Sequence, residues 1–266
     1  MQNSLKGLYP ISPSEFLSDT SYIDNCIAVI HSGVSLFQFR SKGFSAKKKR
    51  KYISTLYEEC VRCNVQFIIN DFYFELDKYE SAGLHLGFND GNIKLLREKY
   101  GDHRIIGVSC YDSVEKAREA ERQGASYVSF GSMYNTFNKK DFTICKSEVI
   151  IRANRYIQIP ICVIGGINLS NIAEQIDLKP NMIAIIDGIF KDKNFPDNLT
   201  SFLNLIRIGD CMNKPLTFKN THNRLFRRNQ NMPDQNIDEY LVEDYNFPLS
   251  NSDNGKPKSE QDKFLM

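Results

Sequence analysis

The sequence has little net charge and no apolar run long enough to cross a membrane. It holds 34 Lys and Arg against 32 Asp and Glu, a formal net charge of +2. A balance this close to neutral is not the electrostatic footprint of a protein whose main partner is nucleic acid or an acidic membrane. No run approaches the roughly 18 uncharged apolar residues of a membrane helix, and residues 1–12 lack the apolar core of a signal peptide. These absences predict a soluble, cytoplasmic protein.

The cysteines do not form a disulfide framework. There are seven, an odd number, spread from Cys26 to Cys211 in mostly apolar surroundings. This pattern is typical of reduced, buried thiols in a cytosolic protein. Cys60 and Cys63 form a lone C-x-x-C with no second pair, which favours a structural role over a metal or redox site.

Eight short apolar runs alternate with longer amphipathic segments. The runs are residues 7–12, 34–39, 66–70, 83–86, 104–109, 127–131, 161–165 and 183–187. Because the runs are continuous rather than alternating, they indicate parallel strands covered on both faces. Segments 45–63, 112–123 and 143–156 have helical spacing. This order predicts a single α/β domain, a (β/α)8 TIM barrel, a fold of roughly 200–250 residues.

The alternative is an open, doubly wound sheet. That fold normally carries a glycine-rich phosphate turn after its first strand. Here Pro10 and Pro13 stand at that position, and no G-x-G-x-x-G occurs in the chain. The barrel is therefore the better interpretation.

The composition changes after residue 211. Residues 212–266 are rich in Asn, Asp, Lys, Ser and Pro and have only scattered apolar side chains. We expect the barrel to occupy residues 1–211 and a polar, mostly disordered C-terminal extension to occupy residues 212–266. Within the extension, the pattern around residues 236–245 allows one short helix. A solvated appendage is favoured over a partner-binding segment.

Polar side chains follow several of the expected strands. In a TIM barrel the carboxyl ends of the strands build the active site. Gln38, Arg40 and Lys42 alternate after the second strand, so their side chains point the same way. Further candidates at the later strand ends are Asn70, Asp71, Asp90, Ser109, Thr136, Asn138, Lys139 and Gly166.

The charges among these candidates predict a phosphate site that includes a metal. Arg40, Lys42 and Lys139 supply positive charge for an anion. Asp71 and Asp90 would repel a bare phosphate, but they suit Mg²⁺, which takes one or two carboxylates together with substrate phosphate oxygens. Gly166 and the glycine before it leave backbone amides open to a second phosphate. The implied substrates are a diphosphate and a monophosphate.

Each residue also has an ordinary structural explanation. A cation at a strand end is commonly only solvated, and Asn70-Asp71 is a common turn pair. His85 is interpreted as a structural histidine near the barrel interior. The concurrence of complementary polar residues at consecutive strand ends favours the site.

In this order the motifs resemble the thiamine-phosphate synthase family over roughly residues 5–205. The motifs are G-L-Y-P-I-S at 7–12, Q-x-R-x-K at 38–42, Asn70-Asp71, H-L-G at 85–87 with Asp90, G-V-S at 107–109, the segment 127–141 and I-G-G-I at 164–167. The resemblance implies condensation of 4-amino-2-methyl-5-hydroxymethylpyrimidine diphosphate with a thiazole phosphate. The products are thiamine phosphate and pyrophosphate, and the cofactor is Mg²⁺.

The resemblance also implies roles for individual residues. Asp71 and Asp90 would hold Mg²⁺, and Arg40, Lys42 and Lys139 would be catalytic. The implied substrate-binding residues are Gln38, Phe39, Arg40, Ser41, Lys42, Asn70, Ser109, Thr136, Asn138, Lys139, Gly166, Ile186 and Asp187. Asp187 departs from the family, which usually carries Ser there.

Two alternatives stay open at this point. A related barrel, the thiazole tautomerase, moves a proton on thiazole phosphate and would not require Lys139 or the pair Asp71 and Asp90. A non-catalytic barrel that binds a phosphate ligand would not require the intact carboxylate pair either. Both are weaker interpretations than the synthase, and all three involve small-molecule phosphates rather than nucleic acid or membrane.

Overall fold

The computed structural model describes residues 5–13, 18–41, 43–135, 143–191 and 195–212. Eight parallel strands are hydrogen-bonded in the order β1-β8-β7-β6-β5-β4-β3-β2. They are β1 (Gly7–Pro10), β2 (Leu36–Phe39), β3 (Gln66–Asn70), β4 (Gly83–Gly87), β5 (Ile106–Tyr111), β6 (Tyr127–Phe130), β7 (Ile161–Ile164) and β8 (Met182–Ile185).

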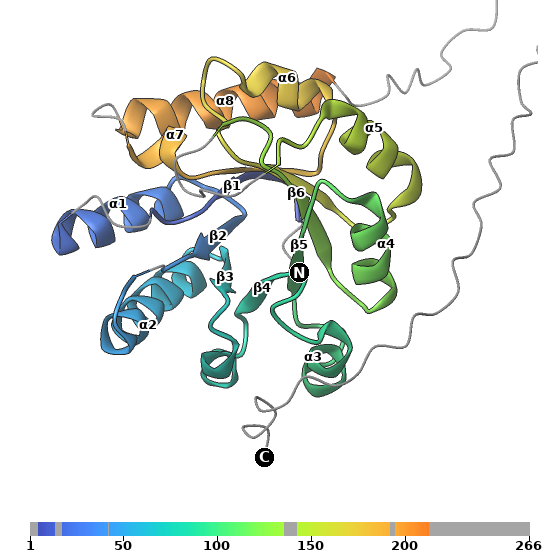
Figure 1. The fold of residues 1–266 in the computed structure, drawn as a ribbon. Helices are drawn as coiled ribbons and strands as arrows, with labels where there is room; N and C mark the ends of the chain where they lie inside the picture. Colours follow the sequence, from blue (N-terminus) through green and yellow to red (C-terminus); the bar gives the residue numbers. More distant parts are fainter. Residues whose placement is uncertain (1–4, 14–17, 42, 136–142, 192–194, 213–266) are drawn as a thin grey trace, which may run out of the picture. The chain divides into compact units, whose positions relative to one another are not determined.

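The barrel closes between β1 and β2 by a single bridge, in which Ile11 pairs with Gln38. The backbone N–H of Ser12 donates to the carbonyl of Gln38 at 2.8 Å in the same place. The predicted (β/α)8 barrel is therefore confirmed as a nearly closed barrel, with helices between its strands (Figure 1).

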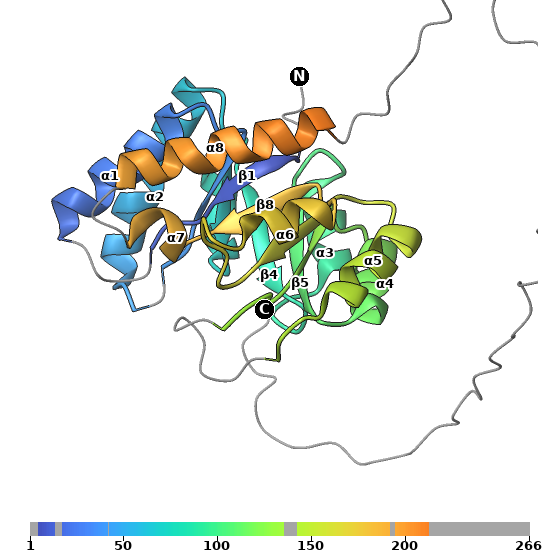
Figure 2. The same ribbon diagram turned by 90° about the horizontal axis from the view of Figure 1, so that it is seen from above.

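Helices follow the strands in the expected alternation. They are α1 (Asp19–His31), α2 (Ala46–Arg62), α3 (Ile93–Tyr100), α4 (Val114–Arg122), α5 (Ser147–Tyr156), α6 (Ile172–Asp177), α7 (Asp187–Phe190) and α8 (Phe195–Met212). The third connection differs from the expected helix, because it is a short 3₁₀ segment, η1 (Tyr73–Lys78). Helix α8 packs along β1 and against α6 and α7 (Figure 2).

Helix α2 shows why these segments fold as they do. The Ser45 side chain accepts a hydrogen bond from the backbone N–H of Lys48 and so caps the first turn. Tyr52, Ile53, Leu56 and Cys60 recur at helical spacing and are buried against the sheet. The lysines at the start of the helix lie on its more exposed side.

The strands bury apolar side chains on both of their faces. A large cluster fills the space between strands and helices. A second, smaller cluster fills the barrel interior and includes Tyr9, Leu36, Ile68, Tyr127 and Met182. Two-sided burial explains why the strands appear in the sequence as continuous apolar runs.

The last strand ends earlier than the sequence suggested. The expected run extended to residue 187, but β8 stops at Ile185 and Asp187 begins α7. Ile186 has φ −113° and ψ −84°, outside the extended region, so the chain leaves the sheet there. The predictions for Lys42, for Thr136, Asn138 and Lys139, and for the extension from residue 213 onward concern residues outside the described part of the chain.

Among the described residues, no helix combines the length and the apolar character that crossing a bilayer requires.

Gly107→Ala is expected to destabilise the barrel by roughly 3 kcal/mol, because it overpacks the interior and disturbs buried hydrogen bonds. A Cβ at Gly107 would lie 2.0 Å from Cζ of Tyr127, whose side chain is fully buried. Denaturant unfolding measures the change. The matched background is Tyr127→Leu, which removes the clashing atoms, so Gly107→Ala should cost much less there. Equal costs in both backgrounds would contradict this account.

Candidate active site

A cavity of about 930 Å³ opens at the carboxyl ends of the strands. Nine residues predicted from the sequence line it: Gln38, Arg40, Asn70, Asp71, Asp90, Ser109, Gly166, Ile186 and Asp187. The structure thus brings together side chains from five different strand ends and their loops.

Two predicted residues are not part of this lining. Phe39 is 1% exposed and packs edge-on against Tyr52 in the outer core, and Ser41 is also buried outside the cavity wall. Alternation along β2 explains the difference, since it turns Gln38 and Arg40 inward and their neighbours outward. The geometry therefore gives no side-chain role in the site to Phe39 or Ser41.

The two carboxylates come from neighbouring strand ends. Asp71 follows β3 directly, with φ +61°, a backbone conformation that few non-glycine residues adopt. Asp90 lies in the loop after β4, and its carboxylate occupies the space where a Cβ of Gly87 would be, 2.1 Å from Oδ2. Burial raises the pKa of Tyr111, and the negative charges of Asp90 and Asp71 raise it further. Both carboxylates therefore lie within electrostatic reach of one phenol.

Arg40 lies between carboxylates. Burial lowers the pKa of its guanidinium, while the charges of Asp71 and Asp187 oppose that change. An arginine keeps its proton at any physiological pH, so this side chain is a fixed, partly desolvated cation. A cation of this kind suits a bound phosphate group.

A chain of buried hydrogen bonds forms the floor of the cavity. The Gln38 amide donates to the hydroxyl of Tyr9 at 2.7 Å, and that hydroxyl contacts the hydroxyl of Tyr127 at 2.8 Å. The Tyr127 hydroxyl lies 2.8 Å from Nδ1 of His85, whose Nε2 lies 3.0 Å from Oγ of Ser109. Tyr9 and Tyr127 were not recognised from the sequence, because in a strand they are indistinguishable from core aromatics.

His85 is a neutral member of this floor. Burial, and then the charge of Arg40, lower its pKa from 6.5 to about 4. The interpretation of His85 as a structural histidine agrees with its 8% exposure and its two hydrogen-bond partners.

The free energy of unfolding is expected to fall as the pH drops from about 6.5 toward about 4. The unfolded chain binds a proton at His85 in this window and the folded chain does not, so acid favours unfolding by a maximum of roughly 3 kcal/mol. Urea titrations at several pH values measure the slope. His85→Asn should flatten it and His103→Asn, at an exposed surface histidine, should not. An unchanged slope in His85→Asn would contradict the assignment.

A glycine pair after β7 shapes the opposite wall. Gly165 and Gly166 have φ +106° and +68°, and a Cβ on either would lie under 3 Å from residues 132–135. Only glycine allows the two loops to approach this closely. Asn168 and Lys191 also line this side, near Asp187, and neither was recognised from the sequence.

The fold and the cavity define a class of protein. It is a (β/α)8 barrel whose polar cavity lies at the face where enzymes of this fold carry their active sites. The cavity presents a fixed cation, two neighbouring carboxylates and neutral hydrogen-bonding groups, which is a suitable lining for a phosphorylated small molecule.

The comparisons with known proteins narrow this class to a family. Residues 8–189 match the family model described as thiamine monophosphate synthase. The chain belongs to this family. The thiamine-phosphate synthase of Methylococcus capsulatus is 33% identical over 196 residues, 71% of this chain and 87% of the relative. The enzyme of the same name from Nitrosospira multiformis is 33% identical over 207 residues, 77% of this chain and 88% of the relative.

A solved structure confirms the fold. Thiamine phosphate pyrophosphorylase from Pyrococcus furiosus has a TM-score of 0.68 at 23% identity and covers 78% of this chain and 98% of its own. The family resemblance and the transferase class predicted from the sequence are both confirmed by the family model and the curated relatives.

Proposed function

We propose that the chain condenses 4-amino-2-methyl-5-hydroxymethylpyrimidine diphosphate with thiazole phosphate and releases thiamine phosphate and pyrophosphate. The observation that carries the proposal is the meeting of Arg40, Asp71 and Asp90 in one cavity at the strand ends. The membership of the chain in the thiamine monophosphate synthase family supports the same reaction.

The diphosphate is assigned to the cationic side of the cavity. Breaking the carbon–oxygen bond to pyrophosphate develops negative charge on the leaving group, and a fixed cation stabilises that charge as it forms. Arg40 is partly desolvated and keeps its charge beside Asp71 and Asp187, so a fixed cation is already present for this task. Lys42 and Lys139 are proposed as further cations on the same group.

The residues present fit a magnesium ion. Asp71 and Asp90 offer hard oxygen ligands from adjacent strand ends, and both face the same cavity. These two carboxylates would hold Mg²⁺, which would supply charge neutralisation for the diphosphate. Without a cation, the two carboxylates would repel the substrate that Arg40 attracts.

Neutral groups orient the reacting rings. Gln38 and Ser109 belong to the hydrogen-bonded floor, so their polar atoms hold defined positions for the pyrimidine, with Asn70 beside them in the wall. The electron-rich pyrimidine supports the positive carbon that the leaving diphosphate leaves behind, so no covalent nucleophile is required. Holding the thiazole nitrogen in line with that carbon supplies much of the remaining acceleration.

The thiazole phosphate is assigned to the wall after β7 and β8. Gly166, Ile186 and Asp187 line this wall, and Thr136 and Asn138 are proposed beside them. Two unit charges about 4 Å apart repel by roughly 4 kcal/mol at an effective dielectric of 20. Backbone amides rather than the Asp187 carboxylate therefore receive the phosphate, while that carboxylate lies within electrostatic reach of Arg40.

Incubation of the purified chain with both substrates and Mg²⁺ tests the proposal. The expected result is formation of thiamine phosphate and pyrophosphate in equal amounts, with neither product when one substrate is omitted. Binding of both substrates without product would contradict the proposal and favour a phosphate-binding barrel. Proton exchange on thiazole phosphate alone would favour the tautomerase reaction.

A further inference from the structure

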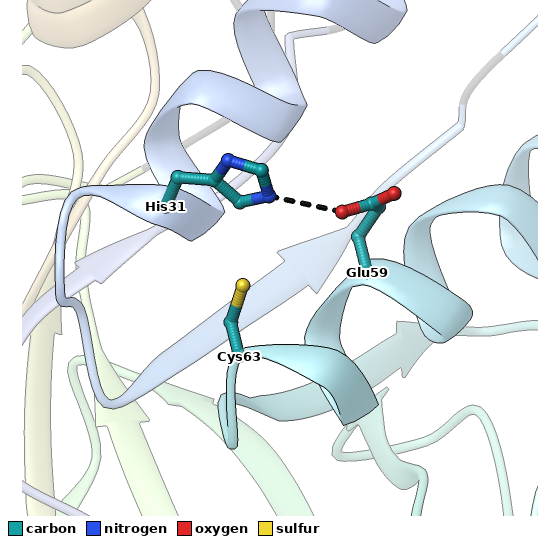
Figure 3. A group of neighbouring side chains, drawn as sticks. All are labelled: His31, Glu59 and Cys63. Carbon is teal, nitrogen blue, oxygen red and sulfur yellow. Dashed lines mark hydrogen bonds and ion pairs between the residues drawn. The ribbon is translucent and has the colours of Figure 1, made fainter.

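A histidine, a glutamate and a cysteine meet on the outside of the barrel, where helices α1 and α2 end. His31 is the last residue of α1, Glu59 lies in the last turn of α2, and Cys63 is the residue that caps α2 (Figure 3). One ligand atom from each residue lies within 4.8 Å of the other two. None of the three lines the cavity at the strand ends.

We propose that His31, Glu59 and Cys63 form a binding site for a zinc-class divalent ion, the fourth ligand being water. Imidazole nitrogen, carboxylate oxygen and thiolate sulfur are the three donor types that Zn²⁺ uses, in a tetrahedral arrangement. The mixed nitrogen and sulfur set excludes Mg²⁺ and Ca²⁺, which require oxygen ligands. The site is therefore chemically distinct from the pair Asp71 and Asp90.

The location favours a cation. A helix carries a partial negative charge at its C-terminus, and two helices end at this cluster. The hydrogen bond from His31 and the charge and hydrogen bond of Arg62 lower the pKa of Glu59, so the carboxylate is ionised and available as a ligand.

Arg62 competes with the metal for this carboxylate. Its guanidinium contacts Glu59, and Nη2 lies 3.5 Å from Nε2 of His31. The Arg62 side chain is 65% exposed, so it can turn into solvent when an ion enters. The contacts of Glu59 with Arg62 and His31 thus occupy the position that a divalent ion would take.

Closure around the ion needs only small movements and releases one proton. Tetrahedral bonds of the usual zinc lengths place the donor atoms about 3.3–3.7 Å apart. The His31–Glu59 contact of 2.9 Å opens slightly, and Cys63 moves inward. The thiol of Cys63 loses its proton to solvent as the metal–sulfur bond forms, while His31 binds through a neutral ring.

The two cysteines of the C-x-x-C, which the sequence indicated to be structural, differ in their surroundings. Cys60 is fully buried in the core of the barrel, and burial raises the pKa of its thiol. Cys63 instead faces His31 of the preceding helix. Because the helices run antiparallel to the strands they cover, their C-terminal ends lie at the barrel face opposite the active site. A bound ion would clamp α1 to α2 rather than take part in the reaction.

Titration of the reduced full-length chain with Co²⁺, in excess Mg²⁺ to occupy oxygen-only sites, tests the proposal. The expected result is one equivalent of bound Co²⁺ with a sulfur-to-cobalt charge-transfer absorption that Zn²⁺ abolishes. Cys63→Ser should lose the absorption, and His31→Gln should weaken binding at least roughly tenfold. His103→Gln, at an exposed histidine outside the cluster, is the matched control and should bind normally.

A second set of variants makes the result independent of folding effects. Arg62→Gln removes the competing cation and should tighten Co²⁺ binding, the opposite direction from the ligand variants. Zn²⁺ should raise the Tm of the unmodified chain and of His103→Gln but not that of Cys63→Ser, and Cys63→Ser should keep its synthase activity. Absence of the charge-transfer band, its persistence in Cys63→Ser, or weaker binding in Arg62→Gln would overturn the proposal.

Discussion

Asp71→Asn and Asp90→Asn are each expected to lower kcat at least roughly a hundredfold, the scale at which loss of one preorganised electrostatic group acts. Each change keeps the size of the side chain and removes the charge that Mg²⁺ requires. Both carboxylates line the cavity and lie within electrostatic reach of Tyr111. The measurement is steady-state formation of thiamine phosphate at increasing Mg²⁺ concentrations.

Two controls separate this effect from a loss of folding. Asp102→Asn, at an exposed carboxylate outside the cavity, should leave kcat unchanged. Both cavity variants should still unfold cooperatively, with a small fall in Tm expected only for Asp71→Asn, because that change also removes a carboxylate that interacts favourably with Arg40. Full activity of either variant, or of the unmodified chain in excess chelator, would refute the metal assignment.

Gly87 provides a test that keeps both carboxylates. Gly87→Ala places a Cβ 2.1 Å from Oδ2 of Asp90 and 3.4 Å from the Tyr111 hydroxyl. The nearest atom is the end of a flexible side chain, so the fold accommodates the change while the Asp90 carboxylate is displaced. We expect an activity loss smaller than that of Asp90→Asn and a higher Mg²⁺ concentration at half-maximal rate, with an unchanged Tm.

Arg40→Gln should lower kcat/KM at least roughly a hundredfold, with most of the loss in kcat, because the cation meets charge that grows in the transition state. The substitution also removes the positive charge with which Asp71 and Asp187 interact. Initial rates with each substrate varied in turn separate the two parameters. Arg118→Gln, at an exposed arginine of α4, is the control.

One kinetic outcome would assign Arg40 to a different subsite. If kcat were unchanged and only the KM for thiazole phosphate increased, Arg40 would belong to the monophosphate subsite. That outcome would also reverse the assignment of Asp187, because a carboxylate paired with a phosphate-binding arginine would directly compete with the phosphate.

Much of the fold follows from local sequence patterns. Strand β3 begins and ends as the apolar run predicted, and Ser45 and Ser113 cap α2 and α4. These features depend on residues near one another in the chain, since capping hydrogen bonds and the spacing of apolar residues are local. The prediction of a helix in the third connection was wrong because contacts with distant parts of the chain shape this segment. Residues 73–78 pack at the ends of β3 and β4 as a 3₁₀ turn, and Glu75 is held there by Arg50 and Lys78.

The candidate site also combines features that local sequence patterns predict with features that depend on the whole fold. Alternation along β2 was enough to place Gln38 and Arg40 on one wall, and the rule that barrel sites lie at the carboxyl ends of strands added Asn70, Asp71 and Ser109. The sequence by itself thus determined the barrel, the face that carries the cavity and most of its charged lining. Only the tertiary structure decided that Tyr9, His85 and Tyr127 share one hydrogen-bonded floor, and that Cys63 lies beside His31 and Glu59 where two helices end. The physical reason is that such contacts join residues far apart in the chain, and their geometry depends on the shear and closure of the whole barrel, which no local pattern encodes.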